Sequence, residues 1–239
     1  MNNIKFEVSI IIPCFNEKNT IKSIFDKVNA SKAFNKEIII VDDCSTDGSN
    51  AIIREISKDN PSVKTIFHEK NEGKGAAIKT GLKSSTGDLI LIQDADLEYD
   101  PIDYENLIQP FIKYNADVVY GSRFMGGRGP KRLHLFWHKL ANKVLTLITN
   151  IFTNLNMTDM ETGYKLFKKK YIDIDKLEEK SFGIEPEITI KLAKKKVKFF
   201  EFHKDLSNRK FMDEYKFNVY RRKSLVNIER NQMEKDFSF

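Results

Sequence analysis

Residues 88–96, Asp-Leu-Ile-Leu-Ile-Gln-Asp-Ala-Asp, place two carboxylates directly after a short apolar run. An apolar run of this length between polar residues is typical of a strand that is buried on both faces of a parallel sheet. In sheets of this kind, ligands bind beyond the carboxyl ends of the strands. We therefore expect Asp94 and Asp96 to lie at a ligand site.

The pair Asp94 and Asp96 is also the strongest metal-site candidate in the sequence. Both carboxylates can reach one divalent cation, which prefers oxygen ligands, and they leave coordination positions free for phosphate oxygens and water. Glu98 is a candidate third ligand. Acidic pairs also cap helices, and Asp100 before Pro101 has the pattern of a cap. We predict that Asp94, Asp96 and Glu98 hold a metal ion.

The same alternation of apolar runs and polar ends extends through the first 120 residues. Further strands are predicted at 8–13, 37–41, 63–68 and 117–120. Amphipathic segments near 18–30, 48–59, 74–84 and 102–115 lie between the strands and are long enough for crossover helices. This order predicts an α/β fold: a Rossmann-like, mostly parallel sheet with helices on both faces.

Polar or glycine-bearing clusters follow all the predicted strands and should gather at one edge of the sheet. Asp43, after the second strand, can accept a hydrogen bond from a nucleobase or ribose, while Ser45 or Asp47 caps the next helix. Gly73 and Lys74 start a helix and can bring backbone close to a phosphate. The remaining clusters are Pro13, Asn16 and Glu17 after the first strand and Gly121-Ser122-Arg123 after the fifth.

Several function classes are disfavoured by the motifs that the sequence lacks. It contains no G-x-x-x-x-G-K-[ST], no G-x-G-x-x-G after a strand and no G-x-S-x-G, which argues against ATPases, dinucleotide dehydrogenases and α/β-hydrolases. Basic motifs with interleaved aromatic residues are missing too, so nucleic acid is not an expected partner. Cys14 and Cys44 follow isoleucine-rich strands and are interpreted as packing residues.

Charge is distributed unevenly along the 239 residues, whose net charge is +6. Residues 1–119 have a net charge of −5, and residues 120–239 have one of +11. An acidic half suits a bound cation, and a basic half attracts anionic surfaces, although individual lysine runs are more often solvated helix faces. Residues 133–155 have the periodicity of a long amphipathic helix, which would pack on the sheet or lie in a membrane interface.

Five motifs in order resemble family 2 glycosyltransferases, and more narrowly the dolichyl- or polyprenyl-phosphate mannosyl- and glucosyltransferases. Segments 158–167 and 182–188 fit this subgroup as well, so the resemblance covers about residues 6–210. The motifs are Pro13…Asn16-Glu17, Asp42-Asp43-x-Ser45-x-Asp47-Gly48, Asn71-x-Gly73-Lys74-Gly75-x-Ala77, Asp94-Ala95-Asp96-Leu97 and Gly121-Ser122-Arg123.

The resemblance implies a GT-A fold over residues 1–210, with a nucleotide-binding half at 1–123 and an acceptor- and lipid-facing half at 124–210. Residues 211–239 would form a C-terminal arm or tail. The implied activity is an inverting transfer of a hexose from GDP-mannose or UDP-glucose to a polyprenyl or dolichyl phosphate, with Mg²⁺ or Mn²⁺ as cofactor.

The resemblance also implies roles for individual residues. The nucleotide-sugar site would comprise Pro13, Asn16, Glu17, Asp43, Gly73, Lys74, Asp94 and Arg209, and the catalytic set would comprise Asp96, Arg123, Asp159 and Glu161. Arg123 and Arg209 would face phosphates of the donor or acceptor. Asp159 or Glu161 would act as base only for a hydroxyl acceptor, because a phosphate acceptor is already anionic.

Three alternatives stay open at the level of sequence. One is a glycolipid synthase or glycan transferase with a hydroxyl acceptor such as diacylglycerol. The others are a nucleotidyltransferase, which would normally have a glycine- and arginine-rich loop after the first strand, and a non-catalytic nucleotide-binding module. We expect a cytoplasmic protein that associates peripherally with the cytoplasmic membrane face. The oligomeric state is left open.

Overall fold

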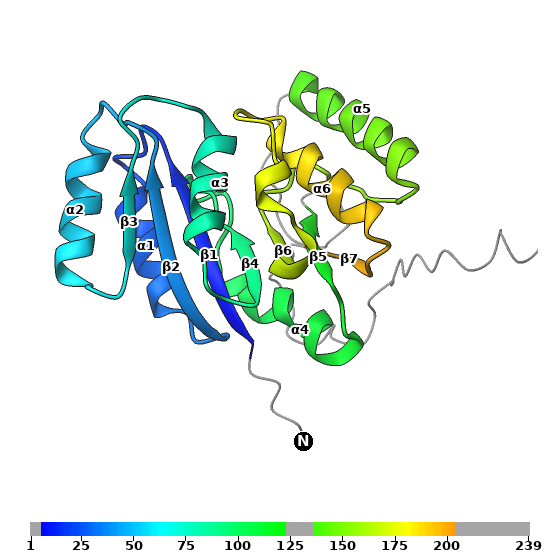
Figure 1. Cartoon of the computed structure of the whole chain (residues 1–239), viewed down its shortest axis with the longest axis horizontal. Coiled ribbons are helices and arrows are strands. Elements are labelled where there is room, and N and C mark those ends of the chain that lie inside the picture. Colours follow the sequence, from blue (N-terminus) through cyan, green and yellow to red (C-terminus); the bar gives the residue numbers. More distant parts are fainter. Residues whose placement is uncertain (1–5, 123–135, 204–239) are drawn as a thin grey trace, which may run out of the picture.

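A seven-stranded sheet forms the centre of the fold in the computed structural model, which describes residues 6–122 and 136–203 (Figure 1). The strands lie in the order β3-β2-β1-β4-β6-β5-β7, and all are parallel except β6. The strands are β1 (Glu7–Cys14), β2 (Asn35–Asp42), β3 (Lys64–Phe67), β4 (Leu89–Ile92), β5 (Val118–Ser122), β6 (Lys165–Lys168) and β7 (Phe199–His203).

Helices cover both faces of this sheet (Figure 1). On one face lie α1 (Ile21–Ala30), α2 (Ser49–Asp59) and α4 (Tyr104–Tyr114). On the other face lie α3 (Lys74–Ser84) and α6 (Ile184–Lys194), and α5 (Phe136–Thr153) packs beside α6. The short 3-10 turns are Pro101–Asp103, Lys169–Tyr171 and Ile174–Lys176. The predicted α/β architecture is confirmed.

The apolar strands divide the core into two layers. Along β1, Val8, Ile10 and Ile12 face the layer with α1 and α2, whereas Ile11 faces α3. Side chains alternate between the faces of a strand, so a strand that is covered on both sides has to be apolar at nearly every position. This is why uninterrupted isoleucine runs form the central strands.

Strand β6 was not among the predicted strands, and it is the only antiparallel one in the described part of the chain. It lies between β4 and β5, where Leu166 is paired with Leu91 on one side and with Val119 on the other. Its four residues include two lysines, and this polar content conceals the strand in a hydropathy pattern. Because β6 lies between β4 and β5, these two strands are not neighbours in the sheet, and their ends are separated by the width of one strand.

Candidate active site

Asp94 and Asp96 lie in a tight turn directly after β4. The buried Gln93 supports this turn, because its Nε2 donates to the carbonyls of Asp94 and Tyr99 at 3.0 and 3.2 Å and its Oε1 accepts from the Tyr104 hydroxyl at 2.8 Å. Asp96 Oδ1 accepts the backbone N–H of Glu98 at 2.9 Å. The backbone of the turn is therefore held by hydrogen bonds while the Asp96 side chain remains partly exposed.

The carboxylates in this turn repel one another. Partial burial raises the pKa of Asp96, and the negative charges of Asp94 and Glu98 raise it further. A bound cation would relieve this repulsion. Among the residues that the structure describes, however, no three His, Cys, Asp or Glu side chains are grouped as metal ligands. In the described part of the chain, Glu98 is therefore not grouped with Asp94 and Asp96 as a third ligand.

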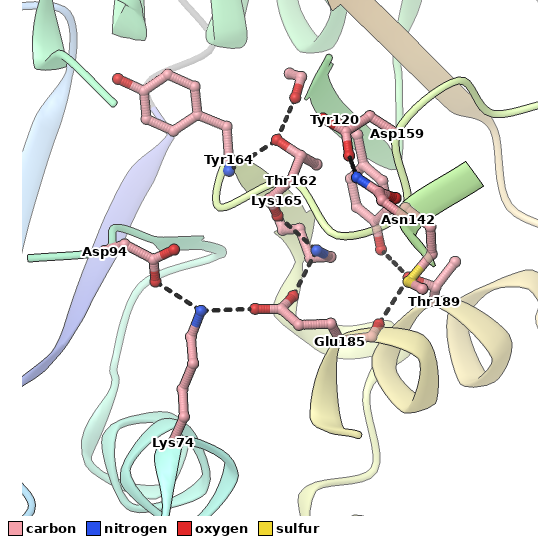
Figure 2. A network of polar contacts seen from close by, with 12 residues as sticks. Lys74, Asp94, Tyr120, Asn142, Asp159, Thr162, Tyr164, Lys165, Glu185 and Thr189 are labelled. Carbon is pink, nitrogen blue, oxygen red and sulfur yellow. Dashed lines mark hydrogen bonds and ion pairs between the residues drawn. The ribbon is translucent and has the colours of Figure 1, made fainter. Parts of the chain in front are cut away.

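A chain of ion pairs leads from Asp94 into the core (Figure 2). Lys74 Nζ, at the start of α3, lies 2.8 Å from Asp94 Oδ1 and 3.0 Å from Glu185 Oε1. Glu185 Oε2 in turn lies 2.5 Å from Nζ of Lys165, a completely buried residue of β6. Lys165 also donates to the Thr162 carbonyl at 2.6 Å. Four charges from four segments thus form one alternating network, which we call the Asp94–Lys165 network.

Gly163 allows the chain to pass close to Asp94. A Cβ at this position would lie 2.5 Å from Asp94 Oδ2 and 2.6 Å from the Tyr99 ring. Since real Cβ contacts are longer than this, only glycine fits here without movement of its neighbours. The segment before β6 is thereby brought against the carboxylate turn after β4.

The start of α3 is covered by another part of the chain rather than left open. Ala76 N donates to the Lys180 carbonyl at 3.1 Å, and a Cβ on Gly73 or Gly75 would clash with the carbonyl of Lys180 or Glu179. The close approach that these glycines permit is therefore to residues 179–181. The expectation that they bring backbone to a phosphate is not supported by this packing, whereas the Lys74 side chain does reach the carboxylate site.

Asp43 joins the end of β2 to the loop before α3. Its Oδ1 accepts from His68 Nδ1 at 2.7 Å and from Glu72 N at 2.9 Å, and its Oδ2 accepts from Gly73 N at 2.7 Å. A carboxylate has about four acceptor positions, so three protein donors leave one for a ligand. Asp43 is 2% exposed, and its first role is to hold this loop.

The residues after β1 are anchored to the start of α2. Asn16 has a φ of 57°, and its N–H donates to Ser45 Oγ at 2.9 Å while its Oδ1 accepts from Thr46 N at 2.8 Å. Glu17 N donates to Ser49 Oγ at 2.8 Å. Two of the predicted nucleotide-site segments are therefore connected directly. Asp47 Oδ1 accepts Ser49 N at 2.9 Å, but the N-cap position of α2 is Gly48 and not Ser45 or Asp47.

The two predicted acceptor-side carboxylates differ in burial. Asp159 is completely buried and accepts from Asn142 Nδ2 of α5 at 2.9 Å (Figure 2), which argues against contact with a reacting sugar. Glu161 is partly exposed and lies two residues before Gly163. Glu161 is thus the better base candidate. Arg123 and Arg209 lie outside the described residues.

Three charged residues in or beside the site have no role in the sequence-based prediction: Lys165, Glu185 and Glu201. Glu201 of β7 accepts from the Thr158 backbone and hydroxyl and from Asp159 N, at 2.9–3.1 Å, and burial raises its pKa to about 7. A hydropathy pattern assigns such residues to the surface. The sequence signal for Lys165 and Glu185 was only their place within segments 158–167 and 182–188, and Glu201 lies outside both segments.

A separate open cavity of about 880 Å³ lies at the opposite, amino-terminal end of the strands. Its lining includes Phe6, Phe34, Lys36 and Ile112. It contains none of the predicted site residues.

A mostly parallel sheet with helices on both faces defines the α/β class of proteins. Within that class, the fold is the GT-A glycosyltransferase fold. A mannosyltransferase from Pyrobaculum calidifontis, solved in complex with GDP-Man and Mn²⁺, superposes with a TM-score of 0.61 at 20% identity, over 84% of this chain and 56% of that one. Glucosyl-3-phosphoglycerate synthase from Mycobacterium tuberculosis gives 0.62 at 18% identity, over 83% and 68%.

The chain belongs to the family Glycosyl transferase family 2, whose sequence model matches residues 9–174. A dolichol-phosphate mannosyltransferase from Pyrococcus furiosus is 32% identical over 188 residues, which cover 77% of this chain and 53% of that protein. A UDP-N-acetylglucosamine–dolichyl-phosphate N-acetylglucosaminyltransferase from Methanococcus voltae is 31% identical, over 70% of this chain and 71% of the relative. The chain thus spans about half the length of the Pyrococcus relative. The predicted family and fold are confirmed.

Proposed function

We propose that the protein is a metal-dependent inverting glycosyltransferase that moves a hexose from GDP-mannose or UDP-glucose to a polyprenyl or dolichyl phosphate. The observation that carries this proposal is the Asp94–Asp96 turn at the end of β4, where Asp94 forms an ion pair with Lys74. The names of the Pyrococcus and Methanococcus relatives support a dolichyl phosphate acceptor.

Asp94 and Asp96 would hold Mg²⁺ or Mn²⁺ on the donor diphosphate. The metal would supply positive charge that stabilises the departing nucleoside diphosphate. Two carboxylates leave most coordination positions for phosphate oxygens and water, as such cations require. The Mn²⁺ in the Pyrobaculum and Mycobacterium structures supports this assignment.

The nucleotide would lie along the ends of β1 and β2. The Pro13–Glu17 segment would line its pocket, and Asp43 would use its remaining acceptor position for the base or ribose. Lys74 would reach the diphosphate from the start of α3, since its Nζ already lies at Asp94. Arg123 and Arg209 would add positive charge on the phosphates of donor or acceptor.

Transfer with inversion needs only in-line attack on the sugar from the face opposite the leaving group. A lipid phosphate is already anionic and requires little base catalysis. A hydroxyl acceptor, such as that of diacylglycerol, would need a carboxylate base. The partly exposed Glu161 is the residue that favours this second candidate function.

The acceptor would be reached at the cytoplasmic face of a membrane through peripheral contact. No helix in the described ranges, 6–122 and 136–203, is long and apolar enough to cross a bilayer. Helix α5 instead exposes a row of apolar side chains: Leu140, Val144, Leu145, Leu147, Ile148, Ile151 and Phe152. An amphipathic helix of this kind can lie in a membrane interface.

Nucleotide release tests the proposal. Purified protein is incubated with Mn²⁺ and either GDP-mannose or UDP-glucose, with polyprenyl phosphate, with diacylglycerol or without an acceptor. We expect release that depends on the lipid phosphate, and we expect Asp96→Asn to abolish it while Asp26→Asn, an exposed carboxylate of α1, leaves it intact. Release only with diacylglycerol would establish the hydroxyl-acceptor function, and unchanged release by Asp96→Asn would refute the metal assignment.

A further inference from the structure

Glu185 is connected to Asp94 through Lys74, which forms an ion pair with each of them. It lies on α6, more than 90 residues after Asp94, and its carboxylate contacts Lys74 on one oxygen and Lys165 on the other (Figure 2). Its side chain is 6% exposed, so both ion pairs are largely shielded from water. Pairs of this kind are screened much less than surface pairs.

The charges of the Asp94–Lys165 network sum to zero. Two carboxylates alternate with two ammonium groups, so each buried charge has a partner. Burial by itself raises the pKa of Glu185. The ammonium groups of Lys165 and Lys74 outweigh this effect and hold the pKa of Glu185 well below its usual range. Glu185 therefore stays ionised, and Lys74 is shared between two carboxylates.

We propose that Glu185 is a positioning residue for the metal site: it gives Lys74 a second carboxylate partner, so that Asp94 can bind a divalent cation, and Lys165 holds Glu185 in place. A cation and Lys74 compete for Asp94 because both are positive. With Glu185 present, Lys74 keeps a carboxylate partner when the cation binds. This inference rests on the proposed function, since it concerns the metal at Asp94.

Mn²⁺ binding to the full chain is the readout, measured by electron paramagnetic resonance of free Mn²⁺ with and without GDP or UDP. Glu185→Gln leaves Lys74 with Asp94 as its only carboxylate partner and should weaken Mn²⁺ binding about tenfold, because close charges interact strongly at partly buried sites. Lys74→Met removes the competing cation and should strengthen Mn²⁺ binding without nucleotide. General damage to the fold would weaken binding in both variants, so opposite signs would exclude it as the cause.

A double variant and a matched control complete the test. Glu185→Gln alone leaves Lys165 buried without its carboxylate partner and can prevent folding. Lys165→Met with Glu185→Gln removes both buried charges and leaves the net charge unchanged. This double variant should still bind Mn²⁺ weakly, because Lys74 is again confined to Asp94. The control is Asp117→Asn, which breaks the Lys168–Asp117 pair (2.7 Å) at the other end of β6 and should leave Mn²⁺ binding unchanged.

The outcomes separate this inference from the proposed function. Wild-type protein that binds Mn²⁺ with the same affinity as both Glu185 variants would overturn the inference and leave the function standing. The inference would also be overturned if Asp117→Asn weakened Mn²⁺ binding as much as Glu185→Gln does. If the wild type bound no Mn²⁺ with either nucleotide, both the metal-dependent function and the inference would fail.

Discussion

Gly163 shows at the scale of one residue how closely the site is packed. Its Cα hydrogen points at Asp94 and at the Tyr99 ring, where a methyl group would meet both at 2.5–2.6 Å. Overpacking of this kind shifts neighbouring atoms. Here one of the neighbours is a proposed metal ligand, so the shift should affect function as well as stability.

Gly163→Ala should lower the free energy of unfolding by about 1–3 kcal/mol and weaken Mn²⁺ binding. Gly87→Ala is the matched control, because a Cβ there would lie 2.7 Å from the Glu7 carbonyl, at the opposite end of β4. Both variants should lose stability in urea unfolding, but only Gly163→Ala should bind Mn²⁺ less tightly. Equal Mn²⁺ affinity in the two variants would show that Asp94 is not constrained by Gly163.

Residue types after strand ends could be predicted from sequence, but their partners could not. Asp94 and Asp43 were identified because each directly follows an apolar strand. That Asp43 is held by His68 and by two backbone N–H groups depends on residues 25–30 positions away. Buried Lys165 is the clearest failure, since a lysine is almost never buried unless it is paired, and its partner is on another element.

Glu37 links several strands at the scale of elements. It lies in β2, accepts from Ser9 of β1 and from the backbone of Thr86 and Gly87, and pairs with Lys64 of β3 at 2.8 Å. Burial raises its pKa, but the hydrogen bonds from Lys64, Ser9 and Thr86 together lower it from 4.5 to about 2. The ionised form is therefore the one that stabilises the sheet.

Because the folded-state pKa of Glu37 is depressed, its contribution should be fully present above pH 4.5 and be lost as the pH falls toward about 2. Glu37→Gln should lower the free energy of unfolding at neutral pH, and its difference from wild type should shrink over that acidic interval. Urea unfolding at a series of pH values measures this. A constant difference at all pH values would contradict the predicted ionisation.

The predicted elements of the first 120 residues match the structure closely, whereas the sheet order was only partly accessible. The helix predicted at 74–84 has the observed bounds of α3, and the strand predicted at 37–41 lies within β2. Local periodicity suffices for these elements because a central strand must be apolar on both faces and a helix that packs on the sheet must be apolar along one stripe. Strand β6 was missed because its position depends on pairing with β4 and β5, not on its own four residues.

At the scale of the whole molecule, α5 lies beside α6 at the outside of the fold (Figure 1), and its apolar row is exposed. The second half of the sequence, which contains α5, has a net charge of +11. Apolar burial and attraction to anionic lipids both favour peripheral binding to a membrane, and salt weakens only the second.

Vesicles with anionic headgroups should therefore recover the protein by co-sedimentation more efficiently than neutral vesicles, and added salt should reduce the recovery. Ile151→Asp, at a position that is 70% exposed on α5, should lower recovery several-fold because it opposes apolar insertion and adds negative charge. The control is Ile112→Asp on α4, which is 52% exposed and lies in the other helix layer. Equal loss in both variants, or equal recovery with neutral vesicles, would contradict membrane contact through α5.

The sequence by itself determined the α/β class, the family and the carboxylates at the strand ends, because each depends on local periodicity or on short motifs. Only the tertiary structure decided which of these groups meet. The contacts of Lys74 with Asp94 and Glu185, the burial of Asp159 and the place of β6 all join segments far apart in the chain. The physical reason is that a buried charge is stable only beside its partner, and no local pattern states where that partner will lie.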